Sequence, residues 1–173
     1  GPSVGMFFAE LGAKVVKLEN KKTNGDVTRS WRLSSENSEH PFSAYYGSVN
    51  YGKESIFIDL KNNADYQSLI DLIQDADVLI CNFKYGDAEK FKLDFQSLKS
   101  INPKLIYGEI SGFGNSYRVA YDVVLQAETG FLSMCGTENG EICKMPVALI
   151  DLLAAHQLKE GILLAMLQQH KTK

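Results

Sequence analysis

The feature that most constrains the fold is a regular alternation of short apolar runs with segments of helical spacing. Residues 77–82 are almost wholly apolar until the last one, which is typical of a parallel strand buried on both faces. Hydrophobic patterning predicts three more strands, at residues 14–19, 55–60 and 105–110. Helices are predicted at residues 3–11, 63–73, 87–91, 95–101 and 148–169, with a helix or turn at residues 122–131. Because strands and helices alternate with short connections, we expect an α/β fold with a doubly wound, mostly parallel sheet.

Polar and small residues follow the predicted strands at their carboxyl ends. Glu19 ends the first strand, Asn82 and Phe83 leave the third, and the loop 111–114 follows the fourth. Ligands of open parallel sheets bind beyond these ends, so the pattern predicts a polar ligand there. Neither a GxGxxG nor a GxxxxGK[ST] sequence occurs, so a dinucleotide or P-loop nucleotide site is not indicated. The polar segment 20–40 is predicted to be a long loop, which is usually functional or mobile.

Composition and residue spacing argue against several classes of partner. The net charge is -3 and no basic stripe interleaves with aromatic residues, which argues against a nucleic-acid partner. No apolar run reaches the roughly 18 residues of a membrane span and no signal peptide is visible, so no membrane partner is expected. The three cysteines, Cys81, Cys135 and Cys143, form no CxxC pair, which favours structural thiols and a cytoplasmic setting. The histidines show no HExxH spacing, so no metal site is predicted.

A series of short runs extends over nearly the whole chain in a fixed order. The runs are residues 1–2 with 11–13 and 16–19 (VKLE), 25–29 (GDVTR), 50–55 (NYGKES), 59–61 (DLK), 76–83 (ADVLICNF), 102–107 (NPKLIY), 111–114 (SGFG), 121–122 with 126–127, and 151 with 161–163. In this order they resemble the family III CoA-transferases, the group that includes the formyl-CoA and carnitine CoA-transferases.

The resemblance implies a Rossmann-like large domain and a longer complete protein. On this basis residues 1–173 are expected to be a partial CoA-binding large domain, without the small domain and the C-terminal return segment. The resemblance also implies a homodimer in which two chains are interlinked. Acyl-CoA and a carboxylic acid are then the substrates, and no tightly bound cofactor is expected.

The same resemblance implies a covalent mechanism with Asp151 as the nucleophile. The carboxylate attacks the acyl-CoA thioester and forms an aspartyl-acyl anhydride, then an aspartyl-CoA thioester, from which the second acid takes up CoA. Asp151 opens a strongly apolar predicted helix, whose N-terminus would lower the carboxylate pKa. Asp is also a favoured N-terminal helix cap, so a purely structural cap is the alternative.

Tyr121 lies 30 residues before Asp151 and resembles a tyrosine near the reacting carbonyl. Its hydroxyl would bind the oxyanion or the acid, and a half-buried packing tyrosine is the alternative. The related α-methylacyl-CoA racemases have histidine at this position, because racemisation needs two bases of suitable pKa. Tyrosine, with a pKa near 10, is a poor replacement, so a 2-methylacyl-CoA racemase is the less favoured function. A non-catalytic CoA-binding or oligomerisation piece is the other alternative.

Coenzyme A needs cations for its phosphates and a cleft for its adenine. By resemblance, Asn82 and Phe83 line the CoA cleft, and Gly112 lies in the loop after the fourth strand. The cations assigned to CoA are Lys90, which stands where the family has a phosphate-binding arginine, Lys21 and Arg29, with Lys22 and Arg118 as weaker candidates. For each cation the alternative is a solvated surface charge.

Overall fold

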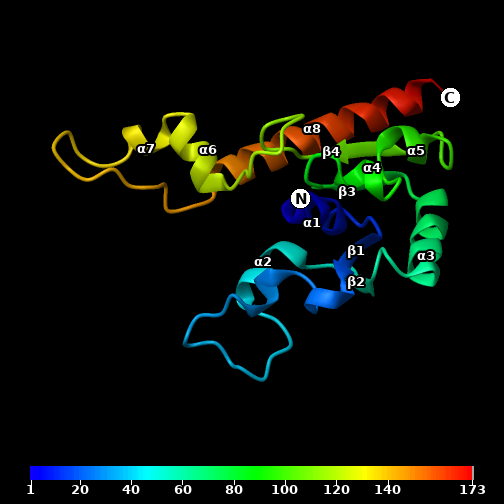
Figure 1. The fold of residues 1–173 in the computed structure, drawn as a ribbon, viewed down its shortest axis with the longest axis horizontal. Coiled ribbons are helices and arrows are strands. Elements are labelled where there is room, and N and C mark those ends of the chain that lie inside the picture. Colours follow the sequence, from blue (N-terminus) through cyan, green and yellow to red (C-terminus); the bar gives the residue numbers. More distant parts are fainter. Residues whose placement is uncertain (173) are drawn as a thin grey trace. The chain divides into compact units, whose positions relative to one another are not determined.

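The computed structural model describes residues 1–172, which fold into two compact units. The first contains residues 1–77 and 99–105, and the second contains residues 78–98 and those from 106 onward (Figure 1). Each unit combines a two-stranded parallel sheet with helices.

The first unit is built on a parallel pair of strands. Its elements are α1 (Pro2–Glu10), β1 (Val15–Asn20), the 3-10 turns η1 (Lys21–Thr23) and η2 (Val27–Ser30), α2 (Ala44–Asn50), β2 (Lys53–Ile58) and α3 (Asn63–Gln74). β1 pairs with β2 in register from Val15 opposite Lys53 to Asn20 opposite Ile58. The buried apolar side chains of this unit are Val4, Tyr46, Ile58, Leu69, Ile70, Ile73 and Leu105.

Side-chain caps define the helices of this unit. Pro2 occupies the first turn of α1, where its missing N–H costs nothing. Asn62 accepts hydrogen bonds from the first two backbone amides that follow Asn63 and so begins α3. At the other end of α3, the amide of buried Asn102 donates to the carbonyls of Ile73 (2.9 Å) and Ala76 (2.8 Å). These bonds satisfy backbone groups that the helix itself leaves unpaired.

The second unit repeats this arrangement with a longer helix. Its elements are β3 (Val78–Cys81), α4 (Asp87–Lys90), α5 (Phe95–Lys99), β4 (Ile106–Glu109), α6 (Asp122–Glu128), α7 (Phe131–Met134) and α8 (Leu149–Lys171). β3 and β4 are parallel, from Val78 opposite Ile106 to Cys81 opposite Glu109. A Cβ atom on Gly108 would lie 3.0 Å from Leu158 and 3.3 Å from Ile162, so this glycine lets α8 lie close against β4.

The predicted α/β class with parallel strands is confirmed, and all four strands and the predicted helices form within a few residues of their expected bounds. In the described residues the four strands make two sheets rather than one continuous sheet. The segment predicted as a loop contains η1 and η2, and α2 was not anticipated. Asn20 and Asp26 cap η1 and η2 with their side chains, which accounts for part of the polar character of the segment, and Ser43, just after it, caps α2. No helix in residues 1–172 combines the length and apolar character needed to span a bilayer.

Candidate active site

The first turn of α8 carries Asp151. The helix begins after Ala148, which has no side chain that can cap it. Instead, Oδ1 of Asp122 accepts hydrogen bonds from the amides of Ile150 (2.8 Å) and Asp151 (3.1 Å). Asp151 is therefore not the cap of its own helix, and among residues 1–172 its exposed carboxylate has no hydrogen-bond partner. The carboxylate is consequently free to meet a ligand.

The charge environment of Asp151 differs from the expected one. We predicted a pKa lowered by the helix N-terminus, but the pKa of Asp151 is raised, first by partial desolvation and then by the negative charge of Asp122. Burial disfavours the charged form of Asp151, and Asp122 takes up two of the amides at the helix start and adds a negative charge nearby. A more basic anion is a better nucleophile, as is established for thiolates.

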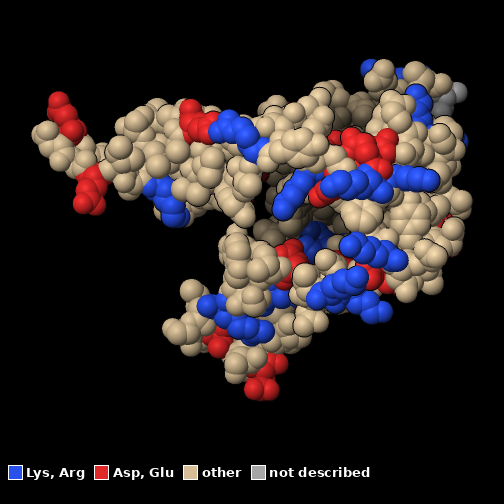
Figure 2. Space-filling view, in the orientation of Figure 1, with Lys and Arg blue, Asp and Glu red and all other residues tan. Residues whose placement is uncertain are grey.

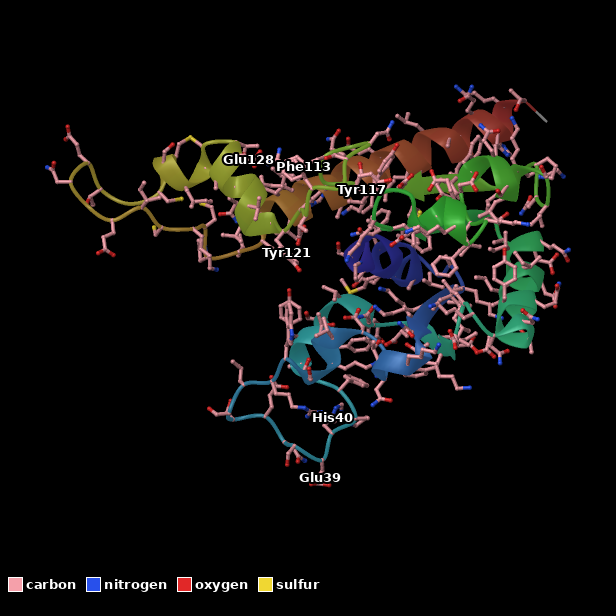
Figure 3. The ribbon with its side chains drawn as sticks, viewed as in Figure 1. Glu39, His40, Phe113, Tyr117, Tyr121 and Glu128 are labelled. Atoms are coloured by element: carbon pink, nitrogen blue, oxygen red, sulfur yellow. The ribbon has the colours of Figure 1, made fainter. Side chains whose placement is uncertain are left out.

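Tyr121 lies at the same junction between helices. It is the N-cap residue of α6 and directly precedes Asp122, whose side chain reaches the start of α8. The phenol is 67% exposed, and its hydroxyl makes no hydrogen bond within residues 1–172, so a half-buried packing role does not fit. Figure 3 shows Tyr121 at the start of α6, Phe113 and Tyr117 on the segment that leads to it, and Glu128 at the end of α6. Tyr121 and Asp151 are thus linked through Asp122, which follows Tyr121 in the chain and accepts from the Asp151 amide.

Two residues that the sequence analysis did not assign to the site hold this junction. Gln126 is 1% exposed and donates through Nε2 to Oδ2 of Asp122 and to the carbonyl of Val147 (3.3 Å). Its Oε1 accepts from the amide of Met145 (2.9 Å). Gln126 therefore links α6 to the segment that enters α8. The available signal was the spacing of Asp122 and Gln126, four residues apart on one predicted helix, which makes them neighbours.

A small pocket lies beyond the carboxyl ends of β3 and β4. It has a volume of about 120 Å³ and includes Phe83 and Lys84, which follow β3, and Glu109 and Ser111, at the end of β4. This is the edge where ligands of parallel sheets bind. The pocket contains Phe83 but not Asn82, which is exposed and immediately follows β3.

The ring of Tyr85, another residue of this pocket, contacts that of Tyr117 edge to face at 4.9 Å.

Lys90 lies in α4, where its ammonium pairs with Asp87 at 2.7 Å and its pKa is raised by that carboxylate. On the face drawn in Figure 2, basic side chains lie beside acidic ones in several places. The positive charge of Lys90 is thus partly compensated.

Gly112 has a steric role that the sequence analysis did not assign. A Cβ atom on Gly112 would lie 1.8 Å from Cβ of Ala120, the residue that precedes Tyr121. The loop after β4 can therefore approach the start of α6 only because residue 112 has no side chain. A contact between Gly112 and CoA stays a prediction.

In the first unit, Arg29 is held by protein groups. Its guanidinium forms a two-point ion pair with Glu19 (2.8 and 2.7 Å), bonds to the hydroxyl of Tyr46 (2.8 Å) and lies over the Tyr46 ring. Burial alone would raise the pKa of Glu19, but hydrogen bonds from Arg29, Tyr46 and the Asp26 amide outweigh it and lower the pKa to about 2. Two of the three guanidinium nitrogens are thus used within the fold, and a role of Arg29 in CoA binding stays a prediction.

The neighbouring lysines differ from each other in their partners. Lys21 is exposed in η1 and has no hydrogen bond or ion pair from its ammonium within residues 1–172. Lys22 pairs with Asp59 at 3.0 Å. Arg118 pairs with Glu128 and lies 3.9 Å from the centre of the Phe113 ring. Of these cations, Lys21 is the most available for an anionic ligand.

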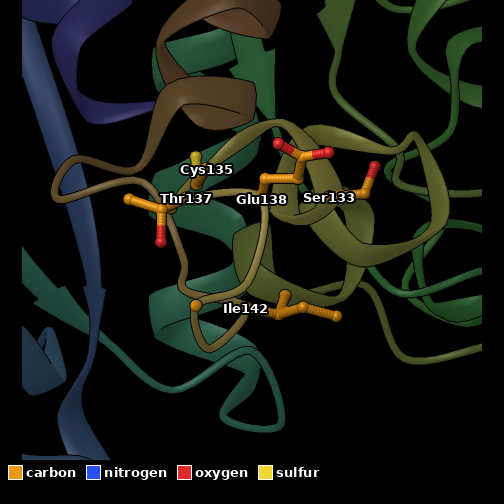
Figure 4. A pocket seen from close by; sticks show the side chains of 7 residues that line it. Ser133, Cys135, Thr137, Glu138 and Ile142 are labelled. Atoms are coloured by element: carbon orange, nitrogen blue, oxygen red, sulfur yellow. The ribbon is translucent and has the colours of Figure 1, made fainter.

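A second pocket, of about 290 Å³, lies in the loop after α7. Ser133, Cys135, Thr137, Glu138 and Ile142 are among the residues that line it (Figure 4). None of the sequence-predicted site residues lines this pocket. The described residues also contain no group of three His, Cys, Asp or Glu side chains that could hold a metal ion.

The parallel strands define an α/β protein, and a polar pocket lies at the carboxyl ends of β3 and β4, where ligands of parallel sheets bind. Residues 1–173 match CoA-transferase family III over their whole length, and the chain therefore belongs to this family. The predicted family assignment is confirmed.

Curated relatives of the chain carry CoA-transferase names. It is 40% identical over 159 residues to succinate–glutarate CoA-transferase of Agrobacterium fabrum, covering 88% of this chain and 40% of the relative. It is 34% identical to succinyl-CoA:mesaconate CoA-transferase of Haloarcula hispanica, covering 99% of this chain and 45% of the relative. The chain thus spans less than half the length of these relatives.

A solved structure has the same fold. The crystal structure of a CAIB/BAIF family protein from Brucella suis superposes with a TM-score of 0.88 at 34% identity. The match covers 99% of this chain and 46% of that one.

Proposed function

We propose that the full-length protein transfers coenzyme A from an acyl-CoA to a free carboxylic acid, with Asp151 as a covalent nucleophile. The observation that carries this proposal is the free carboxylate of Asp151 at the start of α8, in a chain of CoA-transferase family III. The names of the relatives support the same reaction class.

In the first half-reaction, an oxygen of Asp151 attacks the thioester carbon and the C–S bond breaks. This step yields an aspartyl-acyl anhydride and free CoA thiolate. The thiolate then attacks the aspartyl carbonyl carbon and expels the donor acid as a carboxylate, which leaves an aspartyl-CoA thioester. The acceptor acid reverses these two steps, so that new acyl-CoA forms and Asp151 is restored as a carboxylate.

The other site residues bind and orient the substrate. The exposed hydroxyl of Tyr121 donates a hydrogen bond to the oxyanion that develops at the attacked carbonyl. Phe83, Asn82 and Gly112 lie at the sheet edge that receives the pantetheine arm. Lys21 and Lys90 attract the phosphates, with Arg29 more firmly engaged in the fold.

The acid substrates are proposed to be dicarboxylates. The names of several relatives contain succinate, glutarate, mesaconate or oxalate, all of which are dicarboxylic acids. We propose succinyl-CoA as donor, and a cytoplasmic homodimer as the working form, in agreement with the cysteine usage and the family resemblance.

Trapping the covalent intermediate tests the proposal. Full-length protein is mixed with succinyl-CoA, quenched in hydroxylamine and digested, and the hydroxamate is located by mass spectrometry. We expect it on Asp151, and we expect Asp151→Asn to lose both the adduct and CoA transfer to glutarate or mesaconate. Active protein without an adduct on Asp151 would remove this residue from the mechanism. Deuterium exchange at the α-carbon of a 2-methylacyl-CoA would instead indicate a racemase.

A further inference from the structure

We propose that Asp122 is a positioning residue for this reaction: one oxygen of its carboxylate holds the first turn of α8 and thereby fixes Asp151. The inference rests on the proposed role of Asp151 as nucleophile. It assigns to Asp122 a task that does not require contact with the substrate.

The start of α8 lacks a cap of its own. The first N–H groups of a helix have no acceptor within the helix, and Ala148 at the N-cap position has no side-chain oxygen to offer them. Oδ1 of Asp122 accepts both the Ile150 amide and the Asp151 amide, although it comes from another helix. The backbone of Asp151 is therefore fixed by a bond that crosses from α6 to α8.

The carboxylate of Asp122 is itself held in place. Its second oxygen, Oδ2, accepts from Nε2 of Gln126, one turn later in α6. Gln126 is buried and also bonds to the backbone of Met145 and Val147, in the segment that leads into α8. With both oxygens engaged, Asp122 cannot turn towards a substrate, which distinguishes it from Asp151.

The contact also contributes to the raised pKa of the Asp151 side chain. Asp122 is a negative group at the positive end of α8, so it offsets the helix dipole that would otherwise stabilise the Asp151 carboxylate. The raised pKa of Asp151 agrees with this placement. A single carboxylate thus orients Asp151 through its backbone and adds to the desolvation that raises its pKa.

The test measures how fast Asp151 is acylated in single turnover. Full-length wild type, Asp122→Ala and Asp122→Asn are mixed with succinyl-CoA and quenched in hydroxylamine at increasing times. The rate constant of adduct formation is separated from its amplitude, which reports the folded, competent fraction. We expect Asp122→Ala to lower the rate constant about 10- to 100-fold, the loss typical of a misplaced reacting group. We expect Asp122→Asn to be several-fold faster than the alanine variant, because its Oδ1 still accepts the two amides.

The matched control is Asp71→Asn. Asp71 accepts a hydrogen bond from Gln67 four residues away on the exposed face of α3, so it repeats the Asp–Gln pair without capping a second helix. Its acylation rate constant should equal that of wild type. Should Asp122→Ala fail to fold, Asp122→Ser replaces it, since the shorter hydroxyl cannot span to α8, and the same loss is expected.

The outcomes separate the inference from the function on which it rests. An unchanged rate constant in Asp122→Ala, with only the amplitude reduced, would mean a purely structural role and would overturn the inference. Asp122→Asn as slow as Asp122→Ala would overturn the hydrogen-bonding role. Wild type that turns over without an adduct on Asp151 would overturn the proposed nucleophile, and the inference with it.

Discussion

Replacing Arg29 by methionine tests whether this residue belongs to the fold or to the CoA site. Methionine keeps most of the apolar stem and removes the guanidinium. The change leaves Glu19, which is 4% exposed, with a buried carboxylate that has lost its two-point partner. Breaking a buried ion pair from one side costs about 3–5 kcal/mol.

The pKa of Glu19 gives a second magnitude, which covers all of its partners (Arg29, Tyr46, Ser55 and the Asp26 amide) and the opposing effect of burial. Its depression from 4.5 to about 2 corresponds to about 3 kcal/mol of stabilisation of the folded state, of the same order as the mutational figure. Because the folded-state pKa lies below the unfolded one, this contribution is complete above pH 4.5 and is lost as the pH falls towards 2. The difference between wild type and Arg29→Met should therefore shrink over this range.

Urea unfolding of the full-length protein at pH 7 and at several lower pH values measures both effects. Lys22→Met is the matched control, since it removes a neighbouring cation whose ion pair with Asp59 is more exposed, and it should leave the stability nearly unchanged. A loss below about 1 kcal/mol in Arg29→Met, together with weaker CoA binding, would refute the structural interpretation and restore Arg29 to the CoA site.

Three further predictions follow from single contacts. Gly112→Ala should lower the free energy of unfolding by about 1–3 kcal/mol and slow acylation of Asp151, because its Cβ would meet Ala120. The control is Gly161→Ala, whose Cβ has nothing within 4 Å and which should stabilise the protein by about 0.5–1 kcal/mol. Tyr121→Phe should lower kcat by about 100-fold with little change in KM for succinyl-CoA, as expected for a lost oxyanion donor, and an unchanged kcat would contradict that role. Burial, and then the charge of Lys17, lower the pKa of Lys53 to about 8, although hydrogen bonds from its ammonium to Pro2, Val49 and Asn50 favour the charged form. The folded state therefore releases this proton first, and wild-type stability should rise between pH 8 and 10.5 by at most about 3 kcal/mol. Urea titrations should show no such rise in Lys53→Met.

The elements that the sequence predicted well are those whose signal is local. The strand Val78–Cys81 and the helix Leu149–Lys171 follow directly from apolar patterning, which needs no knowledge of distant residues. The helix Ala44–Asn50 escaped prediction because it is short and begins at Ser43, whose hydroxyl also bonds to the carbonyl of Thr28, 15 residues earlier. Contacts of that range are set by tertiary structure and leave little trace in a local pattern.

The candidate site also contains features that could be predicted from the sequence and features that could not. Asp151 and Tyr121 could be proposed from a resemblance in short runs, and the position of Phe83 at the end of a strand followed from the strand itself. The direction of the pKa shift of Asp151 was predicted wrongly, because the sequence places this residue at a helix N-terminus but reveals neither its partial desolvation nor that Asp122 already occupies the amides there. The ion pair between Arg29 and Glu19 was not predicted either, because the sequence does not show which side chains lie close together in the fold.

A nucleophilic carboxylate at a helix start faces conflicting demands. If its own oxygens accepted the free amides of the helix, it would be well oriented but weakly basic, since hydrogen bonds to the charged form lower a carboxylate pKa. If nothing accepted them, the first turn would fray and the carboxylate would be mobile. Asp122 resolves the conflict by accepting the amides in place of Asp151, so that orientation comes through the backbone and basicity is retained at the side chain. Without Asp122, the amides at the helix start would lose their acceptor. We therefore expect its removal to slow acylation of Asp151 even in molecules that remain fully folded.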